Sequence, residues 1–209
     1  GVNPKKFYPT VGKEKLKAKL KIPSSCPIII STRSLEPIYD VETLIKAISL
    51  VLKSNMDAYF IIVGGGSLKR KLEMMAKRLK ISPKVRFIDT VPHMEVAKFL
   101  RASDIYVSTS LSDATSVSLL EAMACSLPTV VTDLKGNREW IKDGIDGFLF
   151  PKRDFRVLAE KILYLLKNQD IRRKFGVVNR RIVEEKGNYE KEMSKMEQLY
   201  KDLLETYKA

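Results

Sequence analysis

Residues 105–132 read IYVSTSLSDATSVSLLEAMACSLPTVVT, and this stretch decides the fold. A short β-branched run, Ile105–Thr109, leads through a polar loop into Ser116–Cys125, a helical pattern that is apolar nearly all round. A second β-branched run follows at Pro128–Thr132. A strand, a helix and a second strand in this order form a βαβ unit, and such units build parallel sheets covered by helices. The stretch therefore predicts an α/β fold.

The same alternation continues on both sides of this unit. Further strands are expected at Ile28–Thr32, Ala58–Val63, Val85–Ile88 and Gly147–Phe150. Helical spacing of apolar residues predicts helices over Val41–Lys53, over a basic segment capped by Ser67, and over His93–Ala102. About six parallel strands with helices on both faces form a Rossmann-like doubly wound sheet.

The chain divides into three predicted parts. Residues 1–22 have little periodicity and are expected to be an interdomain linker. Residues 23–187 form the Rossmann-like domain. Only helical patterns follow Asp154, and Gly187-Asn188 interrupts them, so residues 188–209 are expected to form a separate C-terminal crossover helix. A chain that opens on a linker is expected to follow an upstream domain.

The composition is typical of a soluble globular protein, with 44% apolar and 30% charged residues. No apolar run approaches the roughly 20 residues that span a bilayer, and no secretory leader is recognisable. Cys26 and Cys125 sit in or beside apolar runs and make neither a disulfide framework nor a metal cluster. A cytoplasmic protein is the simplest expectation.

The formal net charge of +13 is concentrated in two segments. Residues 1–22 hold seven lysines and one glutamate, and residues 69–86 hold eight Lys or Arg and one glutamate. Neither segment interleaves aromatic residues as single-strand nucleic-acid binders do, so we expect no nucleic-acid partner. Two interpretations stay open: solvated basic faces, or a surface that attracts an anionic substrate or anionic lipid at the inner face of the membrane.

Loops that follow parallel strands carry the ligands of such folds. Arg33 follows the first strand and can fork onto phosphate oxygens, although an ion pair with Glu36 or Asp40 is an equal alternative. Gly64-Gly65-Gly66 follows the second strand and allows close backbone approach. It matches neither the dinucleotide pattern nor a P-loop, so it is a weak signal.

The loop before Ser116–Cys125 is chemically richer. Asp113 lies on this loop, and the free amides of the residues that open the helix form an anion site with the helix dipole. Glu121 lies just over one turn further along an apolar helix, where an unpaired carboxylate is costly. It pairs either with a neighbouring turn in the core or with ligand hydroxyls such as those of a ribose.

These residues resemble a known family. Asp113 to Glu121 resembles the E-x7-E motif of retaining GT-B glycosyltransferases of the family 4 type. The run EAMACSLPTVVTD at 121–133 and the run NREWIKDGIDGFLFP at 137–151 match two further motifs of that family. Gly1–Pro9 resembles the stretch in which the family's chain enters its second, nucleotide-sugar-binding domain.

The resemblance implies roles for particular residues. Arg33 contacts the donor diphosphate, Glu121 the ribose and Asp113 the hydroxyls of the donor sugar, and these three form the implied catalytic set. The implied substrate-binding positions are Gly64, Gly65, Phe87, Thr115, Ser116 and Val117. The family transfers a hexosyl group from a UDP-, GDP- or ADP-linked sugar with retention, and needs no metal or other cofactor. Transfer also requires the N-terminal acceptor-binding domain.

Three departures from the family pattern leave a second function open. The run Pro37-Ile38-Tyr39-Asp40 replaces the lysine and glycine that usually follow the arginine. Asp113 is shorter than the usual glutamate, and Ala114 and Ser116 replace glycines. The alternative is therefore a non-catalytic nucleotide-sugar-binding module. His93, the only histidine, follows Pro92 and is expected to begin a helix, not to take part in catalysis.

Overall fold

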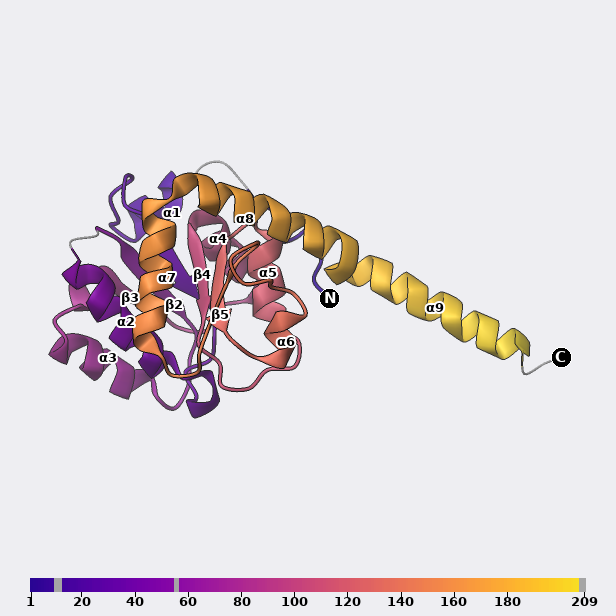
Figure 1. Ribbon diagram of the computed structural model, residues 1–209, viewed down its shortest axis with the longest axis horizontal. Helices are drawn as coiled ribbons and strands as arrows, with labels where there is room; N and C mark the ends of the chain where they lie inside the picture. The colour runs from indigo at the N-terminus through magenta and orange to yellow at the C-terminus, as the bar shows by residue number, and fades with distance from the viewer. Residues whose placement is uncertain (10–12, 55–56, 207–209) are drawn as a thin grey trace.

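A computed structural model describes residues 1–9, 13–54 and 57–206. One parallel sheet has the strand order β3-β2-β1-β4-β5-β6 (Figure 1). The strands are β1 (Ile28–Ser31), β2 (Tyr59–Val63), β3 (Val85–Ile88), β4 (Ile105–Ser108), β5 (Thr129–Thr132) and β6 (Phe148–Phe150). The predicted Rossmann-like fold is confirmed, and each observed strand bound lies within about one residue of the predicted one.

Helices alternate with these strands along the chain. They are α1 (Glu14–Lys19), α2 (Val41–Lys53), α3 (Lys69–Arg78), α4 (His93–Ala102), α5 (Val117–Ala124), α6 (Lys135–Arg138), α7 (Phe155–Lys167), α8 (Gln169–Ile182) and α9 (Tyr189–Thr206). Short 3₁₀ turns lie at Pro37–Tyr39 and Ser82–Lys84, and a π-helical turn at Val183–Gly187 separates α8 from α9. The helices α2 and α4 have the predicted bounds, and α9 is a separate helix as predicted.

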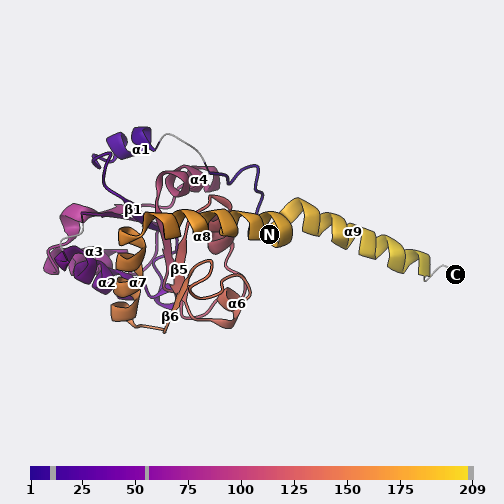
Figure 2. The same cartoon turned by 45° about the horizontal axis from the view of Figure 1, so that its top comes forward.

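The sheet is buried on both faces, as expected for parallel strands with crossover helices. Successive strand residues point to opposite faces. Ile29 of β1 therefore belongs to the core beneath α2, α3 and α7, whereas Ile30 belongs to the core beneath α4 and α5. Figure 2 shows the helices on either side of the sheet. This framework holds the ends of all six strands, and the loops that follow them, in fixed positions.

The N-terminal segment Gly1–Pro9 packs against the end of the domain. Val2 pairs with Asn188 in an isolated parallel bridge, and Phe7 is buried. The guanidinium of Arg180 on α8 donates to the carbonyl of Phe7 at 2.7 Å. The start of the predicted linker is therefore held against α8 and the start of α9.

The last helix, α9, extends far beyond the sheet (Figures 1 and 2). Apolar side chains that are about half exposed or more recur along it at heptad-like spacing. They are Tyr189, Met193, Met196, Tyr200 and Leu203, and the exposed Leu199 and Leu204 flank this row. In the part of the chain that the structure describes, no helix combines the length and apolarity needed to cross a bilayer.

Candidate donor-binding site

The candidate site lies at the carboxyl ends of the two central strands. Chain order along the sheet changes direction between β1 and β4, and in open α/β sheets ligands bind in the crevice outside such a switch point. The loop after β1 carries Arg33, and the loop after β4 carries Asp113 and leads into α5. The fold therefore brings these two predicted positions to one place.

Arg33 is held by three polar side chains and one aromatic ring. Its Nη2 donates to Asp113 Oδ2 at 2.6 Å, and its Nη1 donates to the hydroxyls of Ser116 at 2.9 Å and Ser118 at 2.7 Å. The guanidinium carbon lies 4.3 Å from the centroid of the Tyr39 ring, within the range of a cation–π contact. The aromatic ring lies in the run that replaces the family's lysine and glycine.

The alternative ion pairs of Arg33 with nearby acidic residues are wrong. Glu36 instead accepts from the amide of Ser67 at 2.8 Å and from its hydroxyl at 2.6 Å. Asp40 accepts from the hydroxyl of Thr43 at 2.7 Å. The predicted cap of α3 by Ser67 is also wrong, since α3 begins at Lys69 without a side-chain cap and Ser67 joins the loops after β1 and β2.

The pair of Arg33 and Asp113 is largely shielded from water. The Arg33 side chain is 10% exposed and the Asp113 side chain 16% exposed. Charges in such a position interact more strongly than a solvated pair, because less water screens them. The site therefore contains its own counterion, and an incoming anion must compete with Asp113 for the guanidinium.

The start of α5 presents the predicted anion-binding amides. Ser116 is the N-cap, is buried and accepts from the amide of Leu119 at 3.3 Å, while Thr115 and Val117 are exposed. Among the hydrogen bonds of the described residues, none uses the amide of Thr115, Ser116 or Val117. These N–H groups and the positive end of the helix dipole lie at the end of α5 where Arg33 contacts Ser116 and Ser118.

Helix α6, which the sequence analysis does not predict, fixes the loop that carries Asp113. A Cβ atom at Gly136 would lie 1.7 Å from the carbonyl oxygen of Ala114, so only glycine allows this close approach. The side-chain Nδ2 of Asn137 donates to the Thr132 carbonyl at 2.8 Å and holds α6 at the end of β5. The glycine in Lys135-Gly136-Asn137 is the one sequence signal that indicates this contact.

Glu121 is almost completely buried in α5, with 4% of its surface exposed. Its Oε1 contacts Nε2 of His93, the first residue of α4. Burial raises the pKa of Glu121, while the hydrogen bond and charge of His93 and the charge of Arg33 act in the opposite direction. The prediction that His93 begins a helix is confirmed. Its contact with Glu121 joins two separate helices and has no signal in the sequence.

The glycine loop and Phe87 lie to one side of this cluster. A Cβ at Gly64 would lie 2.5 Å from the carbonyl oxygen of Arg33, and the amide of Leu35 donates to the Gly65 carbonyl at 2.8 Å. The backbone of the Arg33 loop is therefore a close neighbour of this loop, together with the side chains of Thr90 and Glu36. Phe87 lies on β3, two strands from β1, and packs against the core beneath α2 and α3.

The arrangement can bind and stabilise negative charge. A shielded guanidinium and free helix amides are the groups that stabilise a phosphate or a departing diphosphate. The carboxylates of Asp113 and Glu121 can accept from hydroxyl groups. Within residues 1–9, 13–54 and 57–206, no cluster of three or more His, Cys, Asp or Glu side chains is placed to hold a metal ion.

Comparisons with known proteins identify the family of this chain. Residues 12–181 match the family described as glycosyl transferases group 1. N-acetyl-α-D-glucosaminyl L-malate synthase of Bacillus anthracis is 30% identical over 189 residues, which cover 90% of this chain and 49% of that protein. A poly(ribitol-phosphate) α-N-acetylglucosaminyltransferase of Staphylococcus aureus is 30% identical over 167 residues, 78% of this chain and 33% of that protein.

Two solved structures are also similar. Sucrose-phosphate synthase from Thermosynechococcus elongatus has a TM-score of 0.88 at 25% identity, over 99% of this chain and 52% of that one. A mutant of S. aureus TarM in complex with UDP has a TM-score of 0.77 at 27% identity, over 85% of this chain and 36% of that one. This chain spans about half the length, or less, of these relatives. It belongs to the glycosyl transferases group 1 family and forms the C-terminal, Rossmann-like domain of a GT-B fold.

Proposed function

We propose that this chain is the donor-binding half of a retaining glycosyltransferase of the family 4 type. It binds a nucleotide-diphospho-sugar and, joined to an upstream acceptor-binding domain, transfers a hexosyl group to an acceptor. The observation that carries the proposal is the shared position of Arg33, the start of α5 and the buried Glu121 at one edge of the sheet. The TarM relative was solved with UDP, so UDP is the first nucleotide to test.

Each group has a proposed task. Arg33 and the amides of Thr115, Ser116 and Val117 hold the donor diphosphate and stabilise it as it leaves. Glu121 accepts from the ribose hydroxyls, and Asp113 accepts from the hydroxyls of the donor sugar. Because cationic and amide groups supply the electrostatic stabilisation, we propose that the reaction needs no metal or other cofactor.

The site positions that lie beside this cluster are kept as part of the proposal. Gly64 and Gly65 bring the loop after β2 close to the Arg33 loop. Phe87 lies on the edge strand β3, next to β2, where we propose that the nucleotide base binds. Alanine substitution of Phe87 tests this assignment, because it should weaken nucleosides as much as nucleotides.

The upstream domain is the proposed partner of α9. The half-exposed apolar side chains of this helix recur on one side of it, which suits packing against a second domain. We therefore expect the 209 residues alone to bind donor but not to turn it over. Efficient transfer by this chain alone would contradict the proposed need for an upstream domain.

Calorimetric titration with UDP, GDP and ADP tests donor binding directly. One of the three should bind, and its affinity should fall in Arg33→Ala and in Glu121→Ala. Glu185→Gln is a suitable control. It removes an exposed ion pair between Arg181 of α8 and Glu185 of the following π turn. If none of the three nucleotides binds to the wild-type chain, the proposal fails.

The alternative function is a non-catalytic nucleotide-sugar-binding module. It is favoured by the ion pair that occupies Arg33 and by the lack of the family's lysine after it. A transfer assay on the two-domain protein separates the two functions. Donor binding without turnover would favour the module, and turnover with a retained anomeric configuration would favour the enzyme.

We also propose that anionic lipid at the inner face of the membrane is a peripheral partner. A groove of about 320 Å³ lies between α1 and α4, with Leu16 and Phe99 among its apolar residues. Its cationic side chains are Lys15, Lys19, Lys98 and Arg101. The lining also contains Glu95, which is ion-paired with Lys98. Basic side chains beside apolar ones suit lipid headgroups, which attract Lys and Arg electrostatically.

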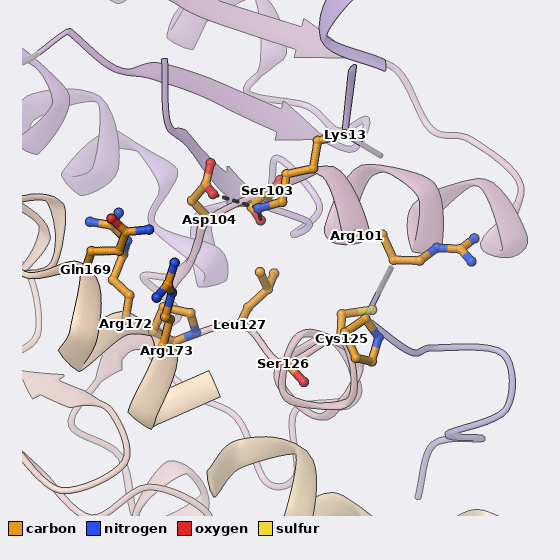
Figure 3. A pocket seen from close by; sticks show the side chains of 12 residues that line it. Lys13, Arg101, Ser103, Asp104, Cys125, Ser126, Leu127, Gln169, Arg172 and Arg173 are labelled. Carbon is orange, nitrogen blue, oxygen red and sulfur yellow. Dashed lines mark hydrogen bonds and ion pairs between the residues drawn. The ribbon is translucent and has the colours of Figure 1, made fainter. Parts of the chain in front are cut away.

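A second pocket extends the same basic surface. It has a volume of about 270 Å³ and lies at the amino ends of β4 and β5, on the opposite edge of the sheet from Arg33. Figure 3 shows Arg172 and Arg173 on one side of this pocket and Lys13 reaching Asp104 on another. Arg101 lines both cavities.

Vesicle sedimentation tests this partner. A triple alanine variant at Lys15, Lys19 and Lys98 should lose binding to vesicles that contain phosphatidylserine. The matched control removes three cations from the second basic segment, at Lys77, Arg78 and Lys80. An equal loss of vesicle binding in the two triple variants would contradict a specific lipid-facing surface. So would unchanged vesicle binding in the variant at Lys15, Lys19 and Lys98.

A further inference from the structure

The only histidine of the chain lies directly over the buried carboxylate of the candidate site. His93 opens α4, and its Nε2 contacts Oε1 of Glu121. The Glu121 side chain is 6% exposed, whereas the His93 side chain is 64% exposed. The imidazole therefore stands at the surface, between solvent and a buried carboxylate.

The imidazole also contacts the N-terminal segment. The rings of Phe7 and His93 lie 5.1 Å apart between centroids, at an angle of 48°. Phe7 is buried, and its carbonyl accepts from Arg180, which also donates to the Ala124 carbonyl at 2.6 Å. Ala124 ends α5, the helix that carries Glu121. His93 and Glu121 are therefore held in place by one connected set of contacts.

We propose that His93 is a positioning residue for donor binding: it orients the Glu121 carboxylate and keeps it ready to accept from the ribose hydroxyls. The inference rests on the proposed function, because it concerns the same site. It adds a residue that the family pattern at Asp113 and Glu121 does not include. A buried carboxylate with free rotation would present its oxygens less precisely, and a partner fixed by Phe7 removes that freedom.

The charges around Glu121 determine how the contact responds to pH. Four groups face the carboxylate: His93 of α4, Arg33 after β1, Tyr106 of β4 and Cys125 at the end of α5. Burial raises the pKa of Cys125 to about 12 and raises that of Tyr106, so neither supplies charge near neutral pH. His93 and Arg33 are thus the groups that favour the ionised carboxylate.

The sign of the pH effect follows from these causes. Burial raises the pKa of Glu121, and His93 opposes this effect. Removing the imidazole should therefore raise the pKa of the carboxyl further. Since a protonated carboxyl is a poorer acceptor for two hydroxyls, nucleotide affinity should fall with decreasing pH, and this fall should begin at a higher pH in His93→Ala.

The experiment titrates UDP, GDP and ADP into the wild-type chain and its variants between pH 5.5 and 8.5, and continues with the nucleotide that binds. His93→Ala should weaken nucleotide binding about tenfold at neutral pH. It should also move the fall in affinity on acidification to a higher pH. His93→Gln retains a neutral N–H donor, so it should recover most of the nucleotide affinity at neutral pH. It should not restore the pH at which that affinity begins to fall. Met94→Ala changes the next, exposed residue of α4 and should leave both unchanged.

A double-mutant cycle with Glu121→Gln completes the test. If His93 acts through Glu121, His93→Ala should have no further effect in the Glu121→Gln background. Equal affinity and an equal pH profile in wild type and both His93 variants would overturn the inference while leaving donor binding intact. If no nucleotide binds to the wild-type chain, the proposed function itself fails. Should His93→Ala not fold, His93→Gln still tests the pH profile.

Discussion

The ion pair of Arg33 and Asp113 leads to a prediction in which stability and affinity change in opposite directions. Asp113→Asn keeps the size of the side chain and a carbonyl acceptor for Arg33 Nη2, and removes only the negative charge. Two unit charges about 4 Å apart attract each other by about 4 kcal/mol at an effective dielectric of about 20. Breaking an exposed pair costs about 0–1 kcal/mol and breaking a buried pair about 3–5 kcal/mol.

The exposure of the two side chains, 10% and 16%, lies between those extremes. We therefore expect the free energy of unfolding of Asp113→Asn to fall by about 2 kcal/mol, because the shielded guanidinium loses its counterion. For a domain of this size, that is a decrease in Tm of about 4–8 °C. The affinity for UDP should rise, because the diphosphate no longer has to displace Asp113. A saving of about 1–2 kcal/mol corresponds to about 5- to 30-fold tighter binding.

Thermal unfolding and calorimetry at one fixed ionic strength measure both quantities on the same samples. The added affinity of a UDP-sugar over UDP should shrink in the variant, because Asp113 is the proposed acceptor for the sugar hydroxyls. Glu185→Gln, on an exposed pair, should change neither quantity. A lower Tm with unchanged or weaker UDP binding would refute the idea that Asp113 competes with the diphosphate for Arg33.

Three other substitutions test neighbouring parts of the site. Gly136→Ala places a Cβ against the Ala114 carbonyl and should lower Tm and UDP affinity together, and a wild-type Tm would contradict the close approach. Tyr39→Ala removes the ring beneath Arg33 and should weaken UDP about fivefold by calorimetry, whereas Tyr39→Phe should not. Burial raises the pKa of Glu121, so the stability linked to its protonation is present at low pH and is lost as pH rises through that pKa. Glu121→Gln should therefore raise Tm at neutral pH, but not at low pH, and weaken nucleotide binding; a Tm difference that does not depend on pH would contradict this linkage.

The fold was predictable because its signals are local. The β-branched runs at Ile28–Thr32 and Pro128–Thr132 and the helical spacing over Val41–Lys53 each depend on residues a few positions apart. Helix α6 was not predicted because a helix of four residues is too short to show periodicity. The start of α3 was misplaced because Ser67, a good capping residue in isolation, is used by Glu36 from another loop.

The nearness of Arg33 and Asp113 was predictable from the sequence, but the pairings of the site's side chains were not. Parallel strands end at the same edge of the sheet, so the loops with Arg33 and Asp113 had to be neighbours once the fold was known. Local spacing pointed to Glu36 or Asp40 as partners of Arg33, whereas its partner Asp113 lies 80 residues along the chain. The contact of His93 with Glu121 is non-local in the same way. Contacts of this kind depend on how helices pack, which periodicity does not encode.

The departures from the family pattern are connected by these pairings. Tyr39, in the run that replaces the usual lysine, places its ring against the guanidinium, and Asp113 is ion-paired with that same guanidinium. On the proposed function, a diphosphate that takes Arg33 also releases Asp113, which then becomes free to accept from the hydroxyls of the sugar. Recognition of the sugar would thus follow recognition of the diphosphate, and free sugar should bind measurably only when UDP is present.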